Sequence, residues 1–374
     1  ASNGNIAMGS NVYTLGKTTG ALFTGGTNTG IGRTLFVVQN GDLTGDNNIG
    51  MGNTIYYTAS GNMEGSDNIG IGQNAFYTSN GNITGRSNMA MGYQQYYLNT
   101  GSFHGYSNIG IGENSYFMQN GNITNTAHHN IALGSYIYRV NSTGSTFSGE
   151  SNIGIGNILY NLSAGNLTGQ RNISMGTSSF FISSGNLSGD DNIGIGNSVM
   201  RGSQGVAGNY NIALGYRSLQ ANQKIAGSNN IAIGSQTLIV GNNDVGSYNI
   251  GIGSQALSGG LGVGTGNIQI GNSTIGTPVA GLLNQVVAIG NEIGGLTTSD
   301  TNSNVILLGN NHGGDAPKIG MGTYKPKAKL HVNGSIIIAN DTNTCNNDTE
   351  GAIRYNRPSK KFEGCDGTNW VSLN

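Results

Sequence analysis

The stretch Asn68-Ile69-Gly70-Ile71-Gly72 is the unit that decides the fold of this chain. Its apolar residues alternate with glycine, which is the pattern of a β-strand with one buried face. The two Ile side chains are therefore expected to be buried, and the glycines to lie on a crowded face that another backbone approaches. The preceding Asn is a residue type that adopts left-handed conformations and caps turns, and stacked copies of it are expected to form a ladder.

This unit recurs along most of the chain. Copies or close variants of it start at Asn5, Asn28, Asn48, Asn88, Asn108, Asn130, Asn152, Asn172, Asn192, Asn211, Asn230, Asn249 and Asn267. The starts are about 20 residues apart, and a weaker motif such as Gly81-Asn-Ile-Thr-Gly85 lies midway. One such unit cannot bury its own apolar residues, whereas a stack can. We therefore predict an all-β solenoid with one coil per period and coils about 4.8 Å apart.

The composition excludes several classes of protein. The chain has 66 Gly and 4 Pro in 374 residues, 9% charged residues and a net charge of −1. No basic excess exists to bind nucleic acid or an anionic membrane, and no apolar run is long enough to span a bilayer. Collagen requires glycine at every third residue, which is not found here. Low charge with high Gly also fits disorder, but the apolar positions keep their phase along the chain, which favours a fold.

A row of large side chains follows the repeat. Eight residues after each motif Asn the chain carries an aromatic residue as far as Phe180 and an aliphatic one from Met200 onward. A second aromatic often comes next, at Tyr57, Tyr77, Tyr97, Phe117 and Phe181. Neighbouring residues of a strand face opposite ways, so one of each pair should be buried and the other exposed or set against another chain. Exposed rings would bind sugars by stacking; the alternative is a core ladder or a subunit interface.

The repeat units resemble the head repeats of trimeric autotransporter adhesins. The longer form over residues 68–92 is similar to repeats of bacterial surface fibres and phage tail fibres. The resemblance covers residues 1–271 and implies a left-handed parallel β-roll in which three chains wind around a threefold axis. It also implies an extracellular homotrimeric fibre, an adhesin that binds a surface glycan or receptor of another cell. The alternatives are a tail fibre on a virion, or a passive shaft whose binding element lies elsewhere.

The C-terminal part differs in composition from the repeats. Residues 272–328 continue the pattern loosely, with rungs expected at 287–290 and 305–309, and are interpreted as degenerate rungs or a neck. Residues 329–374 contain the single Trp and both Cys, and are predicted to form a small β-rich cap. The stretches 350–356 and 362–370 resemble terminal modules of bacterial fibres. We predict a second contact surface on this cap, at Tyr355, Phe362, Asp366 and Trp370.

Cys345 and Cys365 are the two cysteines of the chain. Two Cys without nearby His are a poor zinc site, because structural zinc takes four ligands. A disulfide that closes the cap is the favoured interpretation, and it would place the protein in an oxidising, extracellular environment. Free thiols in a virion assembled in the cytosol are the alternative.

The sequence offers little support for catalysis, a cofactor or a metal. We find no nucleophile elbow and no paired carboxylates, although a glycan-cleaving cleft shared between subunits is a weaker alternative. The pair His128-His129 would supply metal ligands on a threefold axis, but exposed loop histidines are commoner. Asp46 and Asp190-Asp191 lack the oxygen spacing of calcium loops. An ice-binding Thr row is interrupted, since Glu64 and His104 occupy two of its positions. We therefore expect a non-enzymatic protein without cofactor or metal.

Overall fold

The computed structural model of the chain shows β-strands and turns, with no helix in the part that it describes. It describes residues 4–12, 23–35, 38–39, 43–55, 58–59, 63–75, 78–79, 83–95, 98–99, 103–115, 118–119, 122–123, 128–137, 146–160, 166–180, 182, 186–241, 245–258, 264–272, 285–290, 305–308, 319–321, 327–339 and 341–373. Two compact units are distinguished, Ala1–His312 and Gly313–Asn374. The predicted division at residues 271 and 328 stays a prediction.

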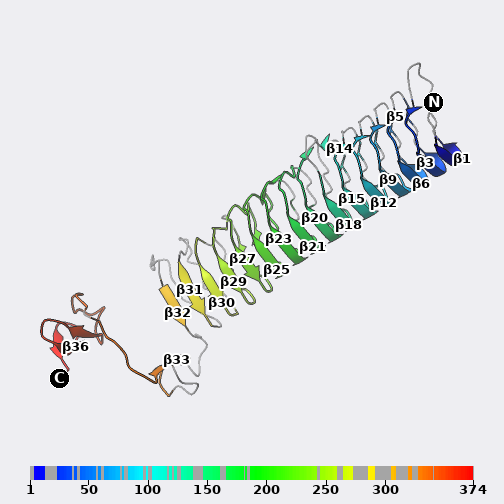
Figure 1. Cartoon of the computed structure of the whole chain (residues 1–374). Helices are drawn as coiled ribbons and strands as arrows, with labels where there is room; N and C mark the ends of the chain where they lie inside the picture. Colours follow the sequence, from blue (N-terminus) through cyan, green and yellow to red (C-terminus); the bar gives the residue numbers. More distant parts are fainter. Residues whose placement is uncertain are drawn as a thin grey trace. The chain divides into compact units, whose positions relative to one another are not determined.

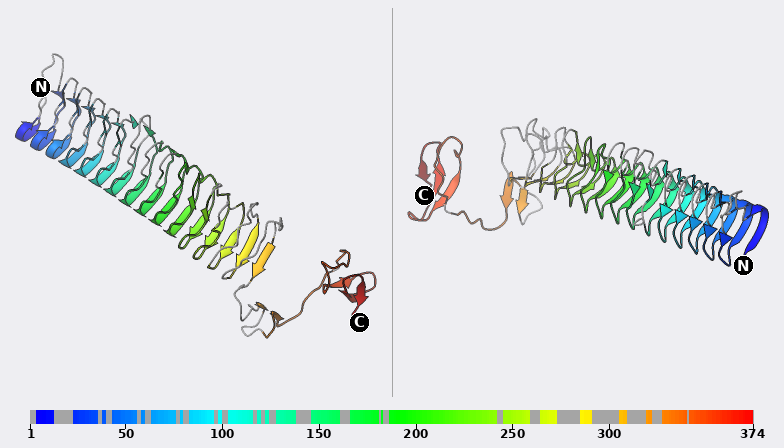
Figure 2. Two further views of the ribbon diagram at one scale, coloured as in Figure 1. Left: turned by 180° about the vertical axis from the view of Figure 1, so that it is seen from behind. Right: turned by 90° about the horizontal axis from the view of Figure 1, so that it is seen from above.

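The first unit is built on one parallel sheet of sixteen described strands that follow one another in chain order (Figures 1 and 2). These strands are β1 (Ile6–Val12), β3 (Thr29–Leu35), β6 (Ile49–Ile55), β9 (Ile69–Gln73), β12 (Met89–Tyr93), β15 (Ile109–Glu113), β18 (Ile131–Ser135), β20 (Ile153–Asn157), β21 (Ile173–Thr177), β23 (Ile193–Asn197), β25 (Ile212–Tyr216), β27 (Ile231–Ile233), β29 (Ile250–Ile252), β30 (Ile268–Ile270), β31 (Val286–Ile289) and β32 (Val305–Leu308). The predicted parallel solenoid is confirmed, and the rungs expected at 287–290 and 305–309 belong to β31 and β32.

Short strands belong to many of the described coils. One sheet contains β2 (Phe23–Thr24), β5 (Leu43–Thr44), β8 (Met63–Glu64), β11 (Ile83–Thr84) and β14 (Phe103–His104). A second contains β4 (Val38–Gln39), β7 (Thr58–Ala59), β10 (Thr78–Ser79), β13 (Leu98–Asn99) and β16 (Met118–Gln119). Described pairs farther along are β17 (Asn122–Ile123) with β19 (Thr146–Phe147), β22 (Asn186–Leu187) with β24 (Gly205–Val206), and β26 (Gln220–Ala221) with β28 (Ile239–Val240). The midway motif of the sequence therefore forms strands of its own.

The expectation that the repeated Ile pair forms the core is wrong. In β9 the residue between the two isoleucines, Gly70, is buried, whereas Ile69 and Ile71 are only half-buried. The same holds where that middle residue is Ala90 or Ala132, which are fully buried. The small residue faces the inside of the coil and the apolar pair faces outward.

The outward residues form a continuous surface, which we call the outer stripe. It consists of the half-buried or exposed Ile6, Met8, Ile31, Ile49, Met51, Ile69, Ile71, Met89, Met91, Ile109, Ile111, Ile131, Leu133, Ile153, Ile155, Ile173, Met175, Ile193, Ile195, Ile212, Leu214, Ile231, Ile233, Ile250, Ile252, Ile268, Ile270, Val287, Ile289 and Leu308. In-register pairing stacks each residue of the stripe on its counterpart one coil away.

Bulky side chains from the far side of the coil explain why the inner position is small. A Cβ on Gly154 would lie 2.5 Å from the Cγ2 atom of Ile137, and one on Gly194 would lie 2.7 Å from the ring of Phe180. Leu159 and Val199 occupy the same interior and are fully buried. The Ile-Gly-Ile strand therefore closes a core that other segments fill.

The two described members of the aromatic row, Tyr160 and Phe180, belong to this core. Tyr160 and Phe180 are fully buried and stack on each other, with ring centroids 5.0 Å apart. The Tyr160 hydroxyl donates a hydrogen bond to the Ile153 carbonyl at 3.1 Å, and burial raises the pKa of Tyr160 well above its ordinary value. In the second half of the unit Met200, Leu219 and Leu238 take the same place, as the sequence pattern indicates.

The predicted Asn ladder is present and buried. The Oδ1 atom of Asn152 accepts from the backbone N–H of Asn172 at 2.9 Å and from its Nδ2 group at 3.1 Å. The same Nδ2 group donates to the carbonyl of Gly189 in the next coil at 2.8 Å. Asn172 in turn accepts from Asn192, and the pattern repeats along the unit. Each ladder Asn therefore joins three consecutive coils.

The left-handed conformation lies one residue earlier than expected. Asp67 and Arg171 have φ angles of 60° and 55°, whereas the ladder residues Asn68 and Asn172 that follow them do not have positive φ. The chain turns sharply at the residue before the ladder, and the ladder side chain points into the coil to bond with its neighbours.

The second unit contains a parallel pair, β33 (Ile319–Met321) with β34 (Leu330–Val332), and an antiparallel sheet of β35 (Ile353–Asn356), β36 (Lys361–Cys365) and β37 (Trp370–Ser372). Cys345 and Cys365 form a disulfide, as predicted.

We expect Asn172→Ala to lower the free energy of unfolding by about 2–4 kcal/mol, because it leaves the Asn192 N–H and the Gly189 carbonyl buried without partners. Chemical denaturation followed by circular dichroism measures the effect. The control is Asn222→Ala at an exposed turn position, which should change stability by less than about 0.5 kcal/mol. Equal effects of the two substitutions would show that the ladder is not a special source of stability.

Candidate functional site

The structure describes only some of the predicted contact residues. Tyr57, Tyr77, Tyr97, Phe117 and Phe181 lie outside the described residues, so their role as a stacking surface stays a prediction.

The four predicted residues of the second unit do not share one surface. Tyr355 and Phe362 face each other across β35 and β36, with ring centroids 5.3 Å apart. Trp370 is paired with Cys365 across β36 and β37. Cys365 is three residues from Phe362 on the same strand, so Trp370 lies on the opposite face of the sheet from the Tyr355–Phe362 pair.

The Tyr355–Phe362 face is apolar and open. Phe362 is 41% exposed, and Ile353, Val371 and Leu373 are also exposed. A partner that contacts these two rings would therefore also contact the apolar side chains beside them.

Trp370 and Asp366 make contacts within the unit. The Trp370 Nε1–H group donates to the Asn343 carbonyl at 2.9 Å, and the guanidinium of Arg354 lies 4.0 Å from the centre of the indole. The Asp366 carboxylate accepts the backbone N–H groups of Asn369 and Thr368, which lowers its pKa. Asp366 therefore holds the turn before β37, and Trp370 ties β37 to Asn343 and Arg354.

A charged pair lies on the same face as Trp370. Arg354 bonds the Glu363 carboxylate through Nε at 2.9 Å and Nη2 at 2.8 Å, and Asn356 donates to the other oxygen of Glu363 at 2.8 Å. The hydrogen bond from Arg354 is the main reason that the pKa of Glu363 is lowered. This face of the sheet is therefore held by interactions that depend on an ionised Glu363.

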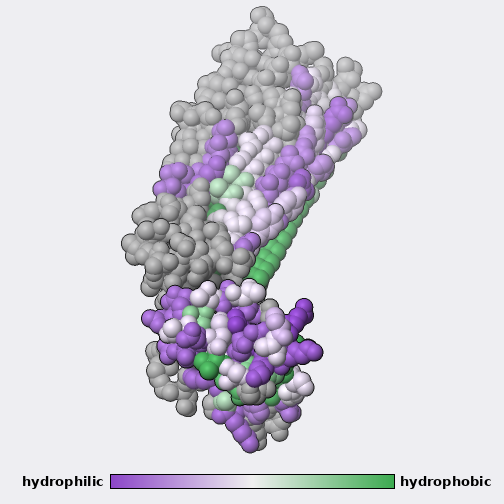
Figure 3. Space-filling model, turned by 90° about the vertical axis from the view of Figure 1, so that its left-hand side faces the viewer, coloured by the Kyte–Doolittle hydropathy of each residue, from purple (hydrophilic) through white to green (hydrophobic). Residues whose placement is uncertain are grey.

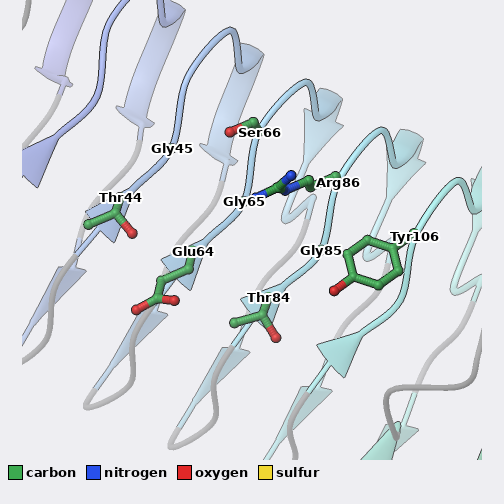
Figure 4. A pocket seen from close by; sticks show the side chains of 9 residues that line it. All are labelled: Thr44, Gly45, Glu64, Gly65, Ser66, Thr84, Gly85, Arg86 and Tyr106. Carbon is green, nitrogen blue, oxygen red and sulfur yellow. The ribbon is translucent and has the colours of Figure 1, made fainter.

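A polar groove crosses several coils near the N-terminal end of the first unit and is the site that the sequence did not single out (Figure 4). One side is formed by Thr44, Glu64 and Thr84, which stand in register on β5, β8 and β11. The other side is formed by residues of the following turns, and the cavity between them has a volume of about 280 Å³. Its lining residues are Thr44, Gly45, Glu64, Gly65, Ser66, Thr84, Gly85, Arg86 and Tyr106.

Glycines form the floor of the groove because the coils stack tightly there. A Cβ on Gly65 would lie 2.0 Å from the Gly85 carbonyl oxygen, and one on Gly45 would lie 1.9 Å from that of Gly65. No side chain fits at this position, so the floor between the two rows consists of backbone.

The turn on the second side normally contains a cap. In most described turns, the residue two positions before the ladder Asn offers a side-chain acceptor to the backbone N–H of the equivalent residue one coil earlier. Asp46 accepts from the Gly26 N–H at 2.6 Å, and Ser66 accepts from Asp46 at 3.1 Å. The equivalent bonds farther along are Gln170 to Asp190, Asp190 to Asn209, Asn209 to Ser228 and Ser228 to Ser247.

The cap is missing inside the groove. The residues that would cap Ser66 and Arg86 are Arg86 and Tyr106, and a guanidinium offers no acceptor. In the described part of the chain, the backbone N–H groups of Ser66 and Arg86 have no hydrogen-bond partner. Two other described turns, at His128 and Glu150, also lack the cap, but neither lines the groove.

Tyr106 closes the end of the groove. Its side chain is 46% exposed and stacks on His128, with ring centroids 4.8 Å apart. The Nδ1 atom of His128 accepts the backbone N–H of Tyr106 at 3.1 Å, so the cap is present again at this turn. One face of the Tyr106 ring is therefore occupied by His128, and the ring is held in place.

A signal for this groove was present in the sequence. At the position two before the ladder Asn the chain has Asp46, Ser66, Asn209, Ser228 and Ser247, all with short polar side chains. Five successive coils depart from that pattern, with Arg86, Tyr106, His128, Glu150 and Gln170 at this position, and of these Arg86 and Tyr106 line the groove. These departures gain a meaning only when the position is known to cap the neighbouring turn, and the structure alone shows that role.

No group of three metal-ligating side chains occurs in the described part of the chain. The two Asp residues considered for calcium have partners within the chain. Asp191 accepts from Arg171 at 2.7 Å, which lowers the pKa of Asp191, and Asp190 caps Gln170. The rings of His128 and His129 are 6.2 Å apart in an edge arrangement. Among the described residues, no helix long and apolar enough to cross a membrane is found.

Reducing the disulfide should destabilise the second unit alone, because both cysteines lie in it. The loop of 20 residues predicts a loss of about 3 kcal/mol. Trp370, the single Trp, reports this unit by fluorescence, and circular dichroism follows the sheet of the first unit. Denaturation with and without reductant should move the first signal and leave the second unchanged. A reductant effect on both signals would contradict separate units.

Acid should destabilise the second unit through Glu363. Because its pKa is lowered on folding, the ionised form is favoured in the folded state. That stability is present above the ordinary Glu pKa of about 4.3 and is lost as the pH falls through the folded value. Denaturation followed by Trp370 fluorescence should show a weaker pH dependence below about pH 4.3 in Glu363→Gln. The matched control is Glu350→Gln, at an exposed position. An unchanged pH dependence in Glu363→Gln would contradict the assignment.

Comparisons with models of protein families, with curated proteins and with solved structures found no match. The likeness to adhesin heads and fibre repeats therefore stays a prediction from the residues themselves.

Proposed function

We propose that this chain is one subunit of a homotrimeric extracellular fibre that attaches to the surface of another cell. The observation that carries the proposal is the outer stripe. Figure 3 shows it as a narrow hydrophobic band along the first unit.

The stripe is unusual for a surface. Ile31, Ile111, Ile195 and Ile289 are 37%, 38%, 40% and 45% exposed, and their counterparts one coil away are apolar as well. Single exposed apolar residues need no explanation, whereas a contiguous apolar patch marks an interaction site. A strip that repeats with the coil spacing is best covered by a partner with the same spacing, which is another copy of this chain.

The narrow width of the stripe supports an axial arrangement. It is two side chains wide on each strand, because only the residues on either side of the buried small position face outward. Copies that converge on one axis each contribute such a narrow strip. The number three and the left-handed winding come from the resemblance to adhesin heads and fibre repeats.

The location and the type of ligand have separate support. The Cys345–Cys365 disulfide fits an oxidising, extracellular environment. A polar groove with a carboxylate, a guanidinium and a tyrosine ring suits recognition of a glycan by the rod itself. This favours an adhesive fibre over a passive shaft, and a receptor-binding tail fibre on a virion would use the same features.

The assembly is tested by the molar mass of the intact protein. Light scattering after size exclusion should give about three times the chain mass of 38.5 kDa. The double variant Ile155→Lys, Ile195→Lys puts charges into the stripe and should shift the mass toward one chain, because buried unpaired charges are costly. The control Asn222→Lys lies outside the long sheet and should leave the mass unchanged. A wild-type protein with the mass of one chain would overturn the trimer.

Adhesion is tested with the same preparation. The labelled trimer should bind to cell surfaces or immobilised glycans, and enzymatic removal of surface glycans should abolish binding to the cells. A trimer that binds no cell and no glycan would leave the passive shaft as the function.

A further inference from the structure

We infer that the groove of residues 44–106 is a binding site for an acidic sugar, a hydroxylated ring that bears a carboxylate. The inference deepens the proposed function, and its biological role rests on that proposal. The groove itself, however, is argued from its own geometry.

The anion-binding end is formed by Ser66 and Arg86. Arg86 is exposed, and its guanidinium presents the planar pair of donors that matches a carboxylate. The unpartnered backbone N–H groups of Ser66 and Arg86 lie in consecutive coils on the same side of the groove. These two N–H groups and the guanidinium therefore supply positive potential to one side of the groove, and no hydrogen bond or ion pair among the described residues engages them.

The chain itself shows what these N–H groups bind. In the equivalent turns the carboxylates of Asp46 and Asp190 accept the N–H groups of Gly26 and Gln170, at 2.6 and 2.8 Å. At Ser66 and Arg86 the same donor is present and the internal carboxylate is not. A ligand carboxylate would take the place that Asp46 and Asp190 take elsewhere in the solenoid.

The opposite side of the groove suits hydroxyl groups. Thr44, Glu64 and Thr84 stand in register along it, with Glu64 exposed between the two threonines (Figure 4). A carboxylate accepts hydrogen bonds, so Glu64 favours hydroxyl donors, and its charge repels a doubly charged group such as phosphate more strongly than a singly charged one. This combination favours a singly charged ligand with hydroxyls on the far side from its acid.

Tyr106 supplies the apolar surface that a sugar ring requires. Its ring is half exposed at the end of the groove and is held by the stack with His128. Aromatic rings offer a flat apolar body beside a polar edge. The volume of about 280 Å³ is small for a binding site and fits a terminal sugar better than a long chain.

The test measures binding of the full-length protein to immobilised oligosaccharides that end in glucuronic acid, galacturonic acid or sialic acid. Each is paired with its carboxyl-reduced, neutral form, and sulfated sugars are a further set. The variants are Arg86→Ser and Tyr106→Ser. Serine at this position is native to the fold, because Ser66 and Ser247 cap Asp46 and Ser228. The control is Arg33→Ser, an exposed arginine on β3 outside the groove.

We expect at least one acidic terminus to bind about tenfold or more tightly than its reduced form. Arg86→Ser should weaken that binding by about tenfold or more, because it removes the guanidinium and caps the Ser66 N–H. Tyr106→Ser should also weaken it, and Arg33→Ser should not. Molar mass and circular dichroism confirm that each variant is assembled and folded.

Three results would overturn the inference: no binding of any acidic sugar, equal binding of acidic and reduced forms, or binding of sulfated sugars alone. Binding that persists in Arg86→Ser and Tyr106→Ser would also overturn it. Adhesion separates the two proposals. A trimer that adheres to cells equally well in all variants keeps the adhesin and loses the groove, whereas acidic-sugar binding without adhesion keeps the groove and loses the adhesin.

Discussion

The stack of coils depends on the buried Asn at the start of each long strand. Its amide is both donor and acceptor, so each copy bonds to the coil before it and to the coil after it. A buried amide without partners costs about 1–3 kcal/mol per group, and the register that satisfies one rung satisfies all of them. Slipping one coil by a residue would break the bonds on both sides. The ladder therefore fixes the register between successive coils, and with it the stacking of the other equivalent residues.

Much of the fold was accessible from the sequence because the repeat is strict. The period, the parallel stack, the Asn ladder and the late rungs in β31 and β32 follow from positions that recur. Tyr160 and Phe180 continue the row of large side chains eight residues after the ladder Asn, and their burial fits the core ladder that the sequence left open as an alternative. Because the coils stack in register, the structure predicted for one repeat applies to the other repeats of the first unit.

The sequence did not show which face of the Ile-Gly-Ile strand is buried. Alternation shows that two faces differ, but it does not show which one faces the core. The answer depends on Ile137, Tyr160 and Phe180, which come from another part of the coil and fill the space above the glycines. Burial of Ile pairs was the natural expectation for a single chain. The proposed homotrimer would supply the cover that these exposed pairs do not find within the chain.

The groove shows how such a regular structure can acquire a site. The glycine floor, the ladder and the caps repeat along the solenoid, so one turn differs from another mainly in the residue that caps it. Replacing two successive caps by Arg86 and Tyr106 frees two backbone donors, adds a positive charge and adds a ring, while the coils keep their register. A repeat protein pays little stability for this change, because the turn residues are exposed and the ladder beneath them is intact. Departures from the repeat at its exposed turns, rather than the repeat itself, are where recognition by this solenoid should be sought.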